Sequence, residues 1–378
     1  MSYGSPTWAD LVHQIRIDPD SDEPRLVAAD YLSDRGDPRG EYIVRACQSA
    51  RCDRELEHRA HFDAWRAPLT ALGAMPFSAP PADPVSMAYR HDYRRGFVDA
   101  VAFWAGGAAN FSEACRLEPI VALEVNNIQR AADTLARAPE LAQIRTLQFG
   151  YDTDGIAPVL ASPLLGALRE LGVSATTSFT PMLAEALGRG AARPARLQGK
   201  LDLATVQTFV ERDVLRDLTV FDHGYVDDQL LVVLAAAPLT ELRTLTLWAP
   251  ALITGSGLLA LGPRLARLEA LTITSLAGDT YLLDRSVIDA LTTCITGGAL
   301  RDLVLGGFSE HDLIALVESP VLAGVERLRL GRGFTVEVGR ALARSPYRSR
   351  LRSLAIHHEV ADFPLDGVRI TRFGAKDK

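Results

Sequence analysis

The chain has 378 residues, of which 48% are hydrophobic and 23% charged, and its formal net charge is −7. This is ample material for a buried core, and the net acidity argues against nucleic acid as the main partner, because phosphate binding needs a basic face. No segment approaches eighteen uninterrupted apolar residues and no basic flank precedes an apolar run at the N-terminus, so we expect a cytoplasmic protein without a membrane span.

Residues 1–60 lack the repeat that dominates the rest of the chain and predict a small helical unit. Thr7 is a suitable N-cap for a helix through Ile17, over which apolar residues recur at helical spacing. The segment DPDSDEP then breaks the helix. A second helix is expected after Pro24, and a third starts with GEYIVRACQ after the turn at residues 36–38.

Six charged residues of this unit are spaced so that ion pairs could fix its helices against one another. They are Asp30, Asp34 and Asp37 with Arg25, Arg35 and Arg39. Direct docking of a partner is the alternative role, and both interpretations stay open.

The cysteines are too few and too scattered for a disulfide framework, and we expect reduced thiols. Cys47, Cys52, His58 and His61 are the residue types that bind zinc. Their spacing is unlike that of known zinc fingers, and a five-residue helical step puts the two cysteines on different faces. We therefore expect no metal and no cofactor.

Residues 61–96 are expected to form a helical or irregular linker and cap. The stretch FSAPPADP, residues 77–84, is rich in proline and small residues and predicts an irregular segment. The apolar residues between Phe97 and Phe103 then predict a first, capping strand.

Between Ile120 and Ile356 the chain repeats one phrase: an apolar residue, two variable ones, an apolar residue, a variable one and another apolar residue. LRTLTL, which begins at Leu242, and LRDLVL, which begins at Leu300, are clear copies. The central leucines, taken as anchors, are Leu123, Leu147, Leu171, Leu197, Leu218, Leu245, Leu271, Leu303, Leu328 and Leu354. Successive anchors are 24, 24, 26, 21, 27, 26, 32, 25 and 26 residues apart, nearly all within the range of about 20–29 residues of one repeat class.

Each phrase predicts a short strand whose alternate side chains enter a core, and apolar residues at helical spacing follow it. Strand, helix and strand with short connections favour parallel pairing. We therefore predict an α/β fold: a leucine-rich repeat solenoid of about 10–11 repeats over residues 97–357, with outer helices, after a small N-terminal all-helical domain. Residues 358–378 are expected to be a C-terminal tail.

Prolines mark the same period. Six of them lie seven or eight residues before an anchor, and they are Pro139, Pro163, Pro238, Pro263, Pro320 and Pro346. Because proline disfavours helix in the residue before it, each helix is expected to stop there.

Three irregularities interrupt the pattern. The weak copy at Leu197 follows a run rich in Gly, Ala and Arg, Gly188–Arg196, which is expected to be an exposed loop open to trypsin-like cleavage at Arg189, Arg193 and Arg196. The gap of 32 residues before Leu303 predicts an insertion at residues 276–284. No asparagine follows the anchors at a fixed position, so irregular outer turns are expected.

Two motifs carry a resemblance to a known family. The stretch DPDSDEPRLVAADYLSDRGDPRGEYIVRACQ is similar to the short bacterial repeat-companion domain that commonly precedes leucine-rich repeats. The matching residues are Asp22, Pro24, Arg25, Leu26, Val27, Ala29, Asp30, Tyr31, Leu32, Gly36, Asp37, Arg39, Gly40 and Glu41. The phrase at Arg94–Val98, RRGFV, resembles the family's entry into the repeats. The resemblance covers roughly a tenth of the chain and implies a bacterial interaction protein with no established catalytic residues.

The strand residues beside each anchor point away from the core and form the expected recognition surface. We predict partner contacts from residues at these outward positions and at the aromatic or histidine position that follows: Phe221, Thr246, Trp248, Thr272, Arg327, Arg329 and His357. Phe221 and Trp248 could instead be core. A row of arginines two residues before the anchors could bind an acidic partner or form cross-strand pairs with Glu170, Asp217 and Asp302; the row is Arg145, Arg169, Arg216, Arg243, Arg301 and Arg352.

No set of nucleophile, base and orienting group is evident. The sequence therefore predicts a non-catalytic protein-binding scaffold or regulator, monomeric in isolation, that recognises a partner protein through its repeats. A regulatory inhibitor or protease substrate released by cleavage is the alternative, and an enzyme or zinc-binding protein is a further one.

Overall fold

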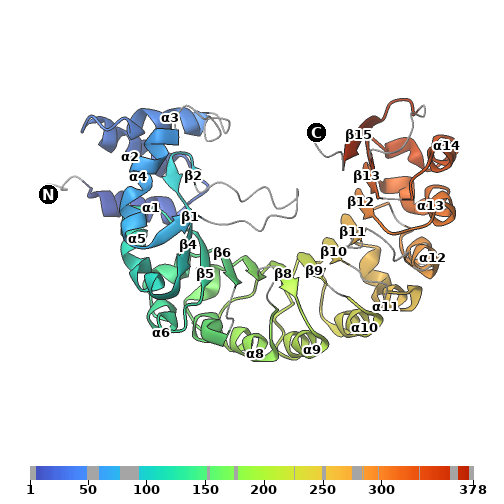
Figure 1. Cartoon of the computed structure of the whole chain (residues 1–378), viewed down its shortest axis with the longest axis horizontal. Coiled ribbons are helices and arrows are strands. Elements are labelled where there is room, and N and C mark those ends of the chain that lie inside the picture. The colour runs from blue at the N-terminus through green and yellow to red at the C-terminus, as the bar shows by residue number, and fades with distance from the viewer. Residues whose placement is uncertain are drawn as a thin grey trace. The chain divides into compact units, whose positions relative to one another are not determined.

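The computed structural model describes residues 6–48, 59–76, 93–150, 154–173, 178–224, 226–248, 253–274, 283, 285–296, 298–331, 333–357 and 365–373. Contacts within the chain divide it into two compact units, unit 1 (Met1–Ala192) and unit 2 (Arg193–Lys378). In each unit the repeat strands form one layer and helices cover one side of it (Figure 1).

Unit 1 begins with the helical region that the sequence predicts. Its helices are α1 (Trp8–Ile17), α2 (Glu23–Ser33), α3 (Arg39–Gln48) and α4 (Arg59–Ala71). Thr7 caps α1 as expected, because its hydroxyl accepts from the Asp10 backbone N–H and the Asp10 carboxylate accepts from the Thr7 N–H in return. The three predicted helices are confirmed, and α4 lies in the segment expected to be a linker.

The rest of unit 1 alternates strands with short helices. The strands are β1 (Ala74–Pro76), β2 (Tyr93–Arg94), β3 (Phe97–Val98), β4 (Ala100–Trp104), β5 (Ala122–Asn126), β6 (Thr146–Gly150) and β7 (Glu170–Val173). The helices are α5 (Phe111–Leu117), α6 (Ala132–Ala136), α7 (Ala157–Leu160) and α8 (Pro181–Arg189), with 3-10 turns at Ala105–Asn110, Pro139–Gln143, Asp154–Ile156 and Leu165–Ala167. β4 to β7 pair in parallel and in chain order, whereas β1 covers the outer edge of β4 in antiparallel pairing. The predicted capping strand is divided in two: Phe97 and Val98 form β3, which pairs with β2, whereas Val101 and Phe103 lie in β4.

Unit 2 continues the same alternation with longer helices. Its strands are β8 (Arg196–Lys200), β9 (Val220–Gly224), β10 (Thr244–Trp248), β11 (Ala270–Thr274), β12 (Asp302–Leu305), β13 (Arg327–Leu330), β14 (Ser353–His357) and β15 (Arg369–Phe373). Its helices are α9 (Leu203–Glu211), α10 (Asp228–Ala236), α11 (Gly255–Leu265), α12 (Arg285–Cys294), α13 (Glu310–Val317) and α14 (Val336–Arg344), with 3-10 turns at Pro320–Gly324 and Arg348–Arg350. Each strand pairs in parallel with the next one along the chain. The predicted leucine-rich repeat solenoid is confirmed.

One anchor was placed wrongly. In the sheet, Phe221 and not Leu218 lies beside the anchors Leu197 and Leu245. The corrected spacings on either side of it are 24 and 24 residues in place of 21 and 27. The sequence obscures the register of this strand because Phe221 stands at the anchor in place of Leu. In addition, His223 occupies the third position of the phrase, which is otherwise apolar. Leu218, fully buried, occupies the first apolar position of the phrase.

The proline rule holds at five of the six sites. α6, α7, α10, α13 and α14 each end two or three residues before their proline. Pro263, however, lies inside α11, which continues to Leu265. The predicted insertion at residues 276–284 lies outside the described residues except for Leu283.

The C-terminal segment is not wholly a tail. Residues 369–373 form β15, which pairs in parallel with β14 and places Ile370 beside the anchor Leu354. The repeated phrase is absent here. Of the core-facing positions of β15, only Ile370 has an apolar side chain. The solenoid sheet therefore extends past the predicted boundary at residue 357.

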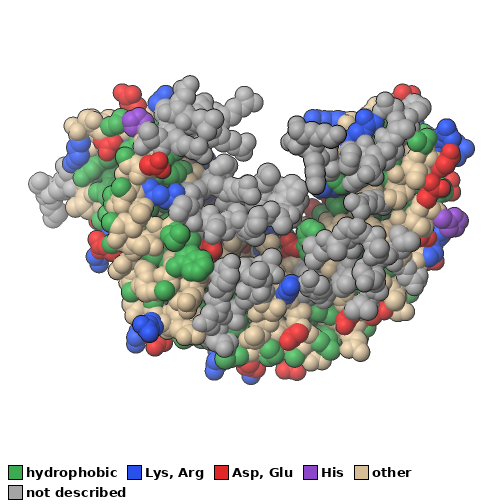
Figure 2. Space-filling view, in the orientation of Figure 1, with side chains coloured by type: hydrophobic (Ala, Val, Ile, Leu, Met, Phe, Trp, Pro, Cys, Tyr) green, Lys and Arg blue, Asp and Glu red, His purple; other side chains and the backbone are tan. Residues whose placement is uncertain are grey.

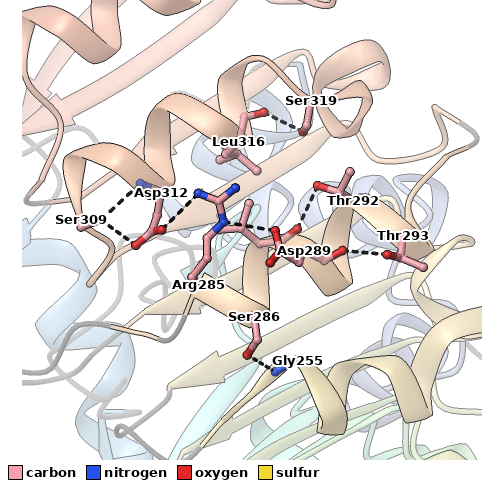
Figure 3. A network of polar contacts seen from close by, with 11 residues as sticks. Gly255, Arg285, Ser286, Asp289, Thr292, Thr293, Ser309, Asp312, Leu316 and Ser319 are labelled. Carbon is pink, nitrogen blue, oxygen red and sulfur yellow. Dashed lines mark hydrogen bonds and ion pairs between the residues drawn. The ribbon is translucent and has the colours of Figure 1, made fainter.

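Polar side chains at the helix N-termini link successive repeats of unit 2. Asp228 at the start of α10 accepts from the backbone N–H and hydroxyl of Thr254, the N-cap of α11, at 2.8 and 2.6 Å. Ser286 accepts from the Gly255 N–H at 2.8 Å. Figure 3 shows the next link, in which Arg285 of α12 reaches Asp312 of α13.

The N-cap Ser309 allows the contribution of one helix cap in unit 2 to be tested. Its hydroxyl accepts from the Asp312 N–H at 3.2 Å and donates to the Asp312 carboxylate at 2.6 Å. We expect Ser309→Ala to lower the free energy of unfolding by about 0.5–2 kcal/mol, because α13 loses its cap. Chemical denaturation measures the change, and Ser309→Thr, which keeps the hydroxyl, is the control. Equal stability of the alanine variant would show that the cap contributes nothing.

The two motifs that resemble the repeat-companion family meet inside unit 1. Arg39, from the first motif, donates from Nε to the carbonyl of Gly96 in the second at 2.9 Å. Its other guanidinium nitrogens bind both carboxylate oxygens of Glu118 at 2.7 Å, and one of these oxygens also accepts from the Val98 N–H at 3.0 Å. Arg39 and Glu118 are 6% and 3% exposed, so this is a buried, fully bonded ion pair.

Glycines allow the close approach at this junction. Gly96 has φ +84° in the turn between β2 and β3, and a Cβ atom there would lie 2.6 Å from a side-chain carbon of Ile43. A Cβ on Gly40 would lie 2.6 Å from the carbonyl oxygen of Ala29. The absence of a side chain at Gly40 therefore lets α3 pack closely against α2. Close packing therefore explains Gly40 and Gly96, whereas Gly36 has open space around it and a φ of +72°.

The predicted ion pairs within the helical region are wrong. No pair forms among these six described residues. Arg25 donates to the carbonyl of Ser21, and Arg35 lies 3.4 Å from the ring centroid of Tyr31. Asp30 is exposed, and Arg39 finds its acidic partner 79 residues away.

Candidate protein-binding face of unit 2

The face of the unit 2 sheet that lies opposite the helices, here the strand face, carries the outward residues of each strand. Along β10 and β11, burial alternates between intermediate and buried, as expected for strands with one covered face. Leu245 and Leu271 point into the core, whereas Thr246 and Thr272 lie side by side on the strand face. Both threonines are half-buried, as their predicted outward position requires.

Trp248 lies on the same face at the end of β10. It is half-buried, and its indole N–H donates to the carboxylate of Asp222 in β9 at 2.9 Å. Asp222 pairs in register with Thr246 and is 7% exposed. The bond fixes the ring over the neighbouring strand, so a large aromatic side chain is held in one orientation beside the threonines.

Phe221 does not belong to this face. It is 1% exposed and contributes to the core, as the alternative interpretation of the sequence had it. Its assignment to partner binding is therefore corrected, because the anchor position points inward. His357 ends β14, but its side chain lies outside the described residues.

Arginines dominate the C-terminal end of the face. The guanidinium of Arg327 binds both carboxylate oxygens of Asp302 on the adjacent strand, and this contact raises the pKa of Arg327. Arg329 places its guanidinium carbon 4.2 Å from the ring centroid of Phe373 in β15. Both predicted arginines therefore lie at the surface, each with a partner within the chain.

Most arginines of the row that precedes the strands form ion pairs. The partners in these ion pairs are not the predicted acids. Arg301 and Arg352 both reach Glu326, at 2.6 and 3.6 Å. Arg243 reaches Glu241 at 3.3 Å and Glu269 at 3.9 Å. Since Leu218 is not an anchor, Arg216 leaves the row, and it pairs with Asp213 in the preceding turn.

The segment Gly188–Arg196 includes a short connection between α8 and β8 that is partly buried. Arg189 lies in the last turn of α8 and Arg196 in β8, and Ala192 between them is fully buried. A Cβ on Gly190 would lie 2.2 Å from the carbonyl oxygen of Leu160. Cleavage at Arg189, Arg193 and Arg196 stays a prediction; Arg189 is exposed, whereas Arg193 and Arg196 are half-buried.

The described residues bring together no group of three side chains able to hold a metal ion. Cys52 and His58 lie outside the described residues. Burial raises the pKa of Cys47 to about 11, so the neutral thiol predominates at neutral pH, whereas zinc binds the thiolate. Among the described residues, no helix has the length and hydropathy to cross a membrane.

Three contributors to the strand face were missed by the sequence. The sequence does not indicate Asp222 as long as Leu218 is taken as the anchor. With Phe221 as the anchor, Asp222 is the next residue and is expected to point outward, as Thr246 does. Arg369 and Phe373 fell in the expected tail, although Ile, Thr and Phe in RITRF are residue types enriched in strands.

No protein-family model and no curated protein matches the sequence. Among solved structures, the chain is similar to one in the "Crystal structure of Rad7 and Elc1 complex in yeast", with 14% sequence identity and a TM-score of 0.46. The match covers 72% of this chain and 80% of that one. The fold assignment accordingly depends on the repeat and the parallel sheet of this chain itself.

Proposed function

We propose that this chain is a non-catalytic scaffold or regulator that binds a partner protein through the strand face of unit 2. The observation that carries the proposal is Trp248, a tryptophan at an outward strand position that is held by Asp222 and flanked by Thr246. Tryptophan and arginine are the residue types that most often dominate binding energy at protein interfaces. A side chain that is already fixed loses less conformational entropy on binding.

The repeat-companion resemblance supports a finer part of the proposal, that this is a bacterial interaction protein. The proposal also includes a cytoplasmic location and a monomeric state in isolation. Within the chain we place the companion domain at residues 1–60, a linker and cap at residues 61–96, and the solenoid after them. An inhibitor released by cleavage has less support, because the segment around Ala192 is partly buried.

Trp248→Ala tests the proposal. We expect partner binding to weaken by at least about tenfold, the effect of losing an interface anchor of roughly 1.4 kcal/mol or more. Thermal unfolding should change little, since the side chain is only half-buried. The measurement is recovery of partner proteins by the immobilised full chain from the native host, quantified by mass spectrometry.

Two further variants complete this experiment. Leu259→Ala removes a side chain that is 50% exposed on α11 and should leave recovery unchanged. Arg327→Glu with Arg329→Glu should reduce it. Normal recovery by all strand-face variants, together with loss on deletion of residues 1–60, would move the recognition surface to the helical region.

A further inference from the structure

Four arginines, here the C-terminal arginine patch, lie on β13 and β15 and directly before β14: Arg327, Arg329, Arg352 and Arg369. The sheet register places Arg327, Ser353 and Arg369 in one row across the three strands. Arg329, Ala355 and Thr371 form the next row. Figure 2 shows Lys and Arg side chains gathered over the end of unit 2, where Figure 1 places β15 and α14.

The arginines of the patch flank a strand with small outward side chains. Neighbouring strands lie about 4.8 Å apart, so the arginines of β13 and the Arg369 side chain stand roughly 10 Å apart across β14. Between them β14 contributes only the small side chains of Ser353 and Ala355. Because Arg329 extends across β14 to Phe373, an extended polypeptide would lie over the arginine side chains and not directly on the sheet.

Positive charge is in excess at this end. From Ser345 to Phe373 the described residues include five arginines but a single acidic residue, Asp366. The other nearby carboxylates are already engaged, because Asp302 binds Arg327 and Glu326 is shared between Arg301 and Arg352. The side chain of Arg352 remains 80% exposed, and Arg369 is exposed with no ion-pair partner among the described residues.

Arg329 is prepared for a carboxylate. It crosses Ala355 to reach Phe373, two strands away, and lies 4.2 Å from the centroid of that ring. A guanidinium that stacks on an aromatic ring uses its face for the contact, and its N–H groups project in its plane. That geometry suits two parallel hydrogen bonds to a carboxylate.

Unit 1 contains an internal example of this chemistry. The carboxylate of Asp20, in the acidic segment between α1 and α2, accepts from Arg94 and Arg145, both at 2.8 Å. These bonds hold the pKa of Asp20 below its usual value. Arg145 and Arg352 occupy the same repeat position, two residues before the anchors Leu147 and Leu354. An acidic segment bound by this arginine position is thus already present in the fold.

We propose that the C-terminal arginine patch binds an acidic, extended segment of the partner protein. This inference rests on the proposed function and specifies the chemistry of the partner. Nucleic acid fits less well, because the net charge of the whole chain is −7 and the excess of arginine is confined to one end of the sheet.

The test uses the full chain and a fluorescein-labelled oligoglutamate peptide, with binding followed by fluorescence anisotropy. We expect saturable binding that Arg329→Gln with Arg369→Gln weakens by at least about tenfold, because the patch loses one arginine from β13 and one from β15. Raising the ionic strength from about 0.05 to about 0.3 M should also weaken it. Unchanged melting temperatures show that the variants are folded.

The control variant is Arg340→Gln with Arg344→Gln, which removes two exposed charges from α14 and should leave peptide binding intact. Equal loss in this variant would overturn the proposal, as would absence of peptide binding, or tighter binding of oligothymidylate than of oligoglutamate. Failure of the proposed function can be distinguished from failure of the patch. If the proposed function is wrong, Trp248→Ala leaves partner recovery intact, whether or not the peptide binds. Failure of the patch alone would leave the effect of Trp248→Ala unchanged.

Discussion

Replacing Glu118 with alanine is expected to lower the free energy of unfolding by about 3–5 kcal/mol, because it leaves the buried Arg39 guanidinium without its counter-ion. The charge cannot reach water, since Arg39 is 6% exposed and enclosed by Trp8, Trp65 and Phe97, whose ring centroids lie 5.0–5.9 Å from the guanidinium carbon. The Val98 N–H also loses its acceptor. Urea denaturation of the full chain measures the effect.

Two comparisons identify the cause. Arg39→Met combined with Glu118→Leu removes both charges and should recover much of the loss, because the desolvated charge disappears with its partner. Glu113→Ala removes one member of an exposed pair with Arg116 and should have little effect. If Glu118→Ala were as mild as Glu113→Ala, the junction would not contribute to stability. Asp30→Ala should also be mild, because Asp30 is exposed and pairs with none of the arginines predicted for it.

The second large effect is expected in the core of unit 2. Phe221→Ala should lower the free energy of unfolding by about 3–5 kcal/mol, because a fully buried ring leaves a cavity between the strands on either side. Leu245→Ala and Leu303→Ala should each cost about 2–5 kcal/mol for the same reason. Phe221→Leu should be milder, since leucine fills the equivalent position in β8 and β10.

The control is Val232→Ala on α10, whose side chain is 54% exposed, and it should be nearly neutral. Contacts in a solenoid are made between neighbouring repeats, so hydrogen exchange in Phe221→Ala should rise first in β8 and β10 and least in β13. Uniform exchange across unit 2, or wild-type stability, would contradict the register that places Phe221 in the core.

The solenoid was predictable because its signal is repeated. Leu245, Leu303 and Leu354 stand at the same position of one phrase, so an error at a single copy does not alter the fold that the set indicates. The individual copy is less secure, as Phe221 shows. Leu218 and Phe221 are both large, apolar and buried, and only the pairing of β9 with its neighbours separates anchor from flank.

Features that depend on contacts distant along the chain could not be predicted. Arg39 pairs with Glu118 across 79 residues, whereas the sequence offered nearer aspartates at helical spacing. The composition around Ala192 suggested exposure, but small residues also allow close packing, as Gly190 against Leu160 demonstrates. On the strand face, the outward position of Trp248 followed from strand alternation, but its bond to Asp222 required the corrected register.

The contacts between α1 and α5 bear on the order in which the protein is made. Trp8 donates to the carbonyl of Leu117 at 3.0 Å, and Arg16 donates to that of Cys115 at 2.7 Å. The last turn of the first repeat helix is thus completed by the earliest residues of the chain. Since synthesis proceeds from the N-terminus and domains generally form in that order, β4 and α5 have their closing partners before the later repeats leave the ribosome.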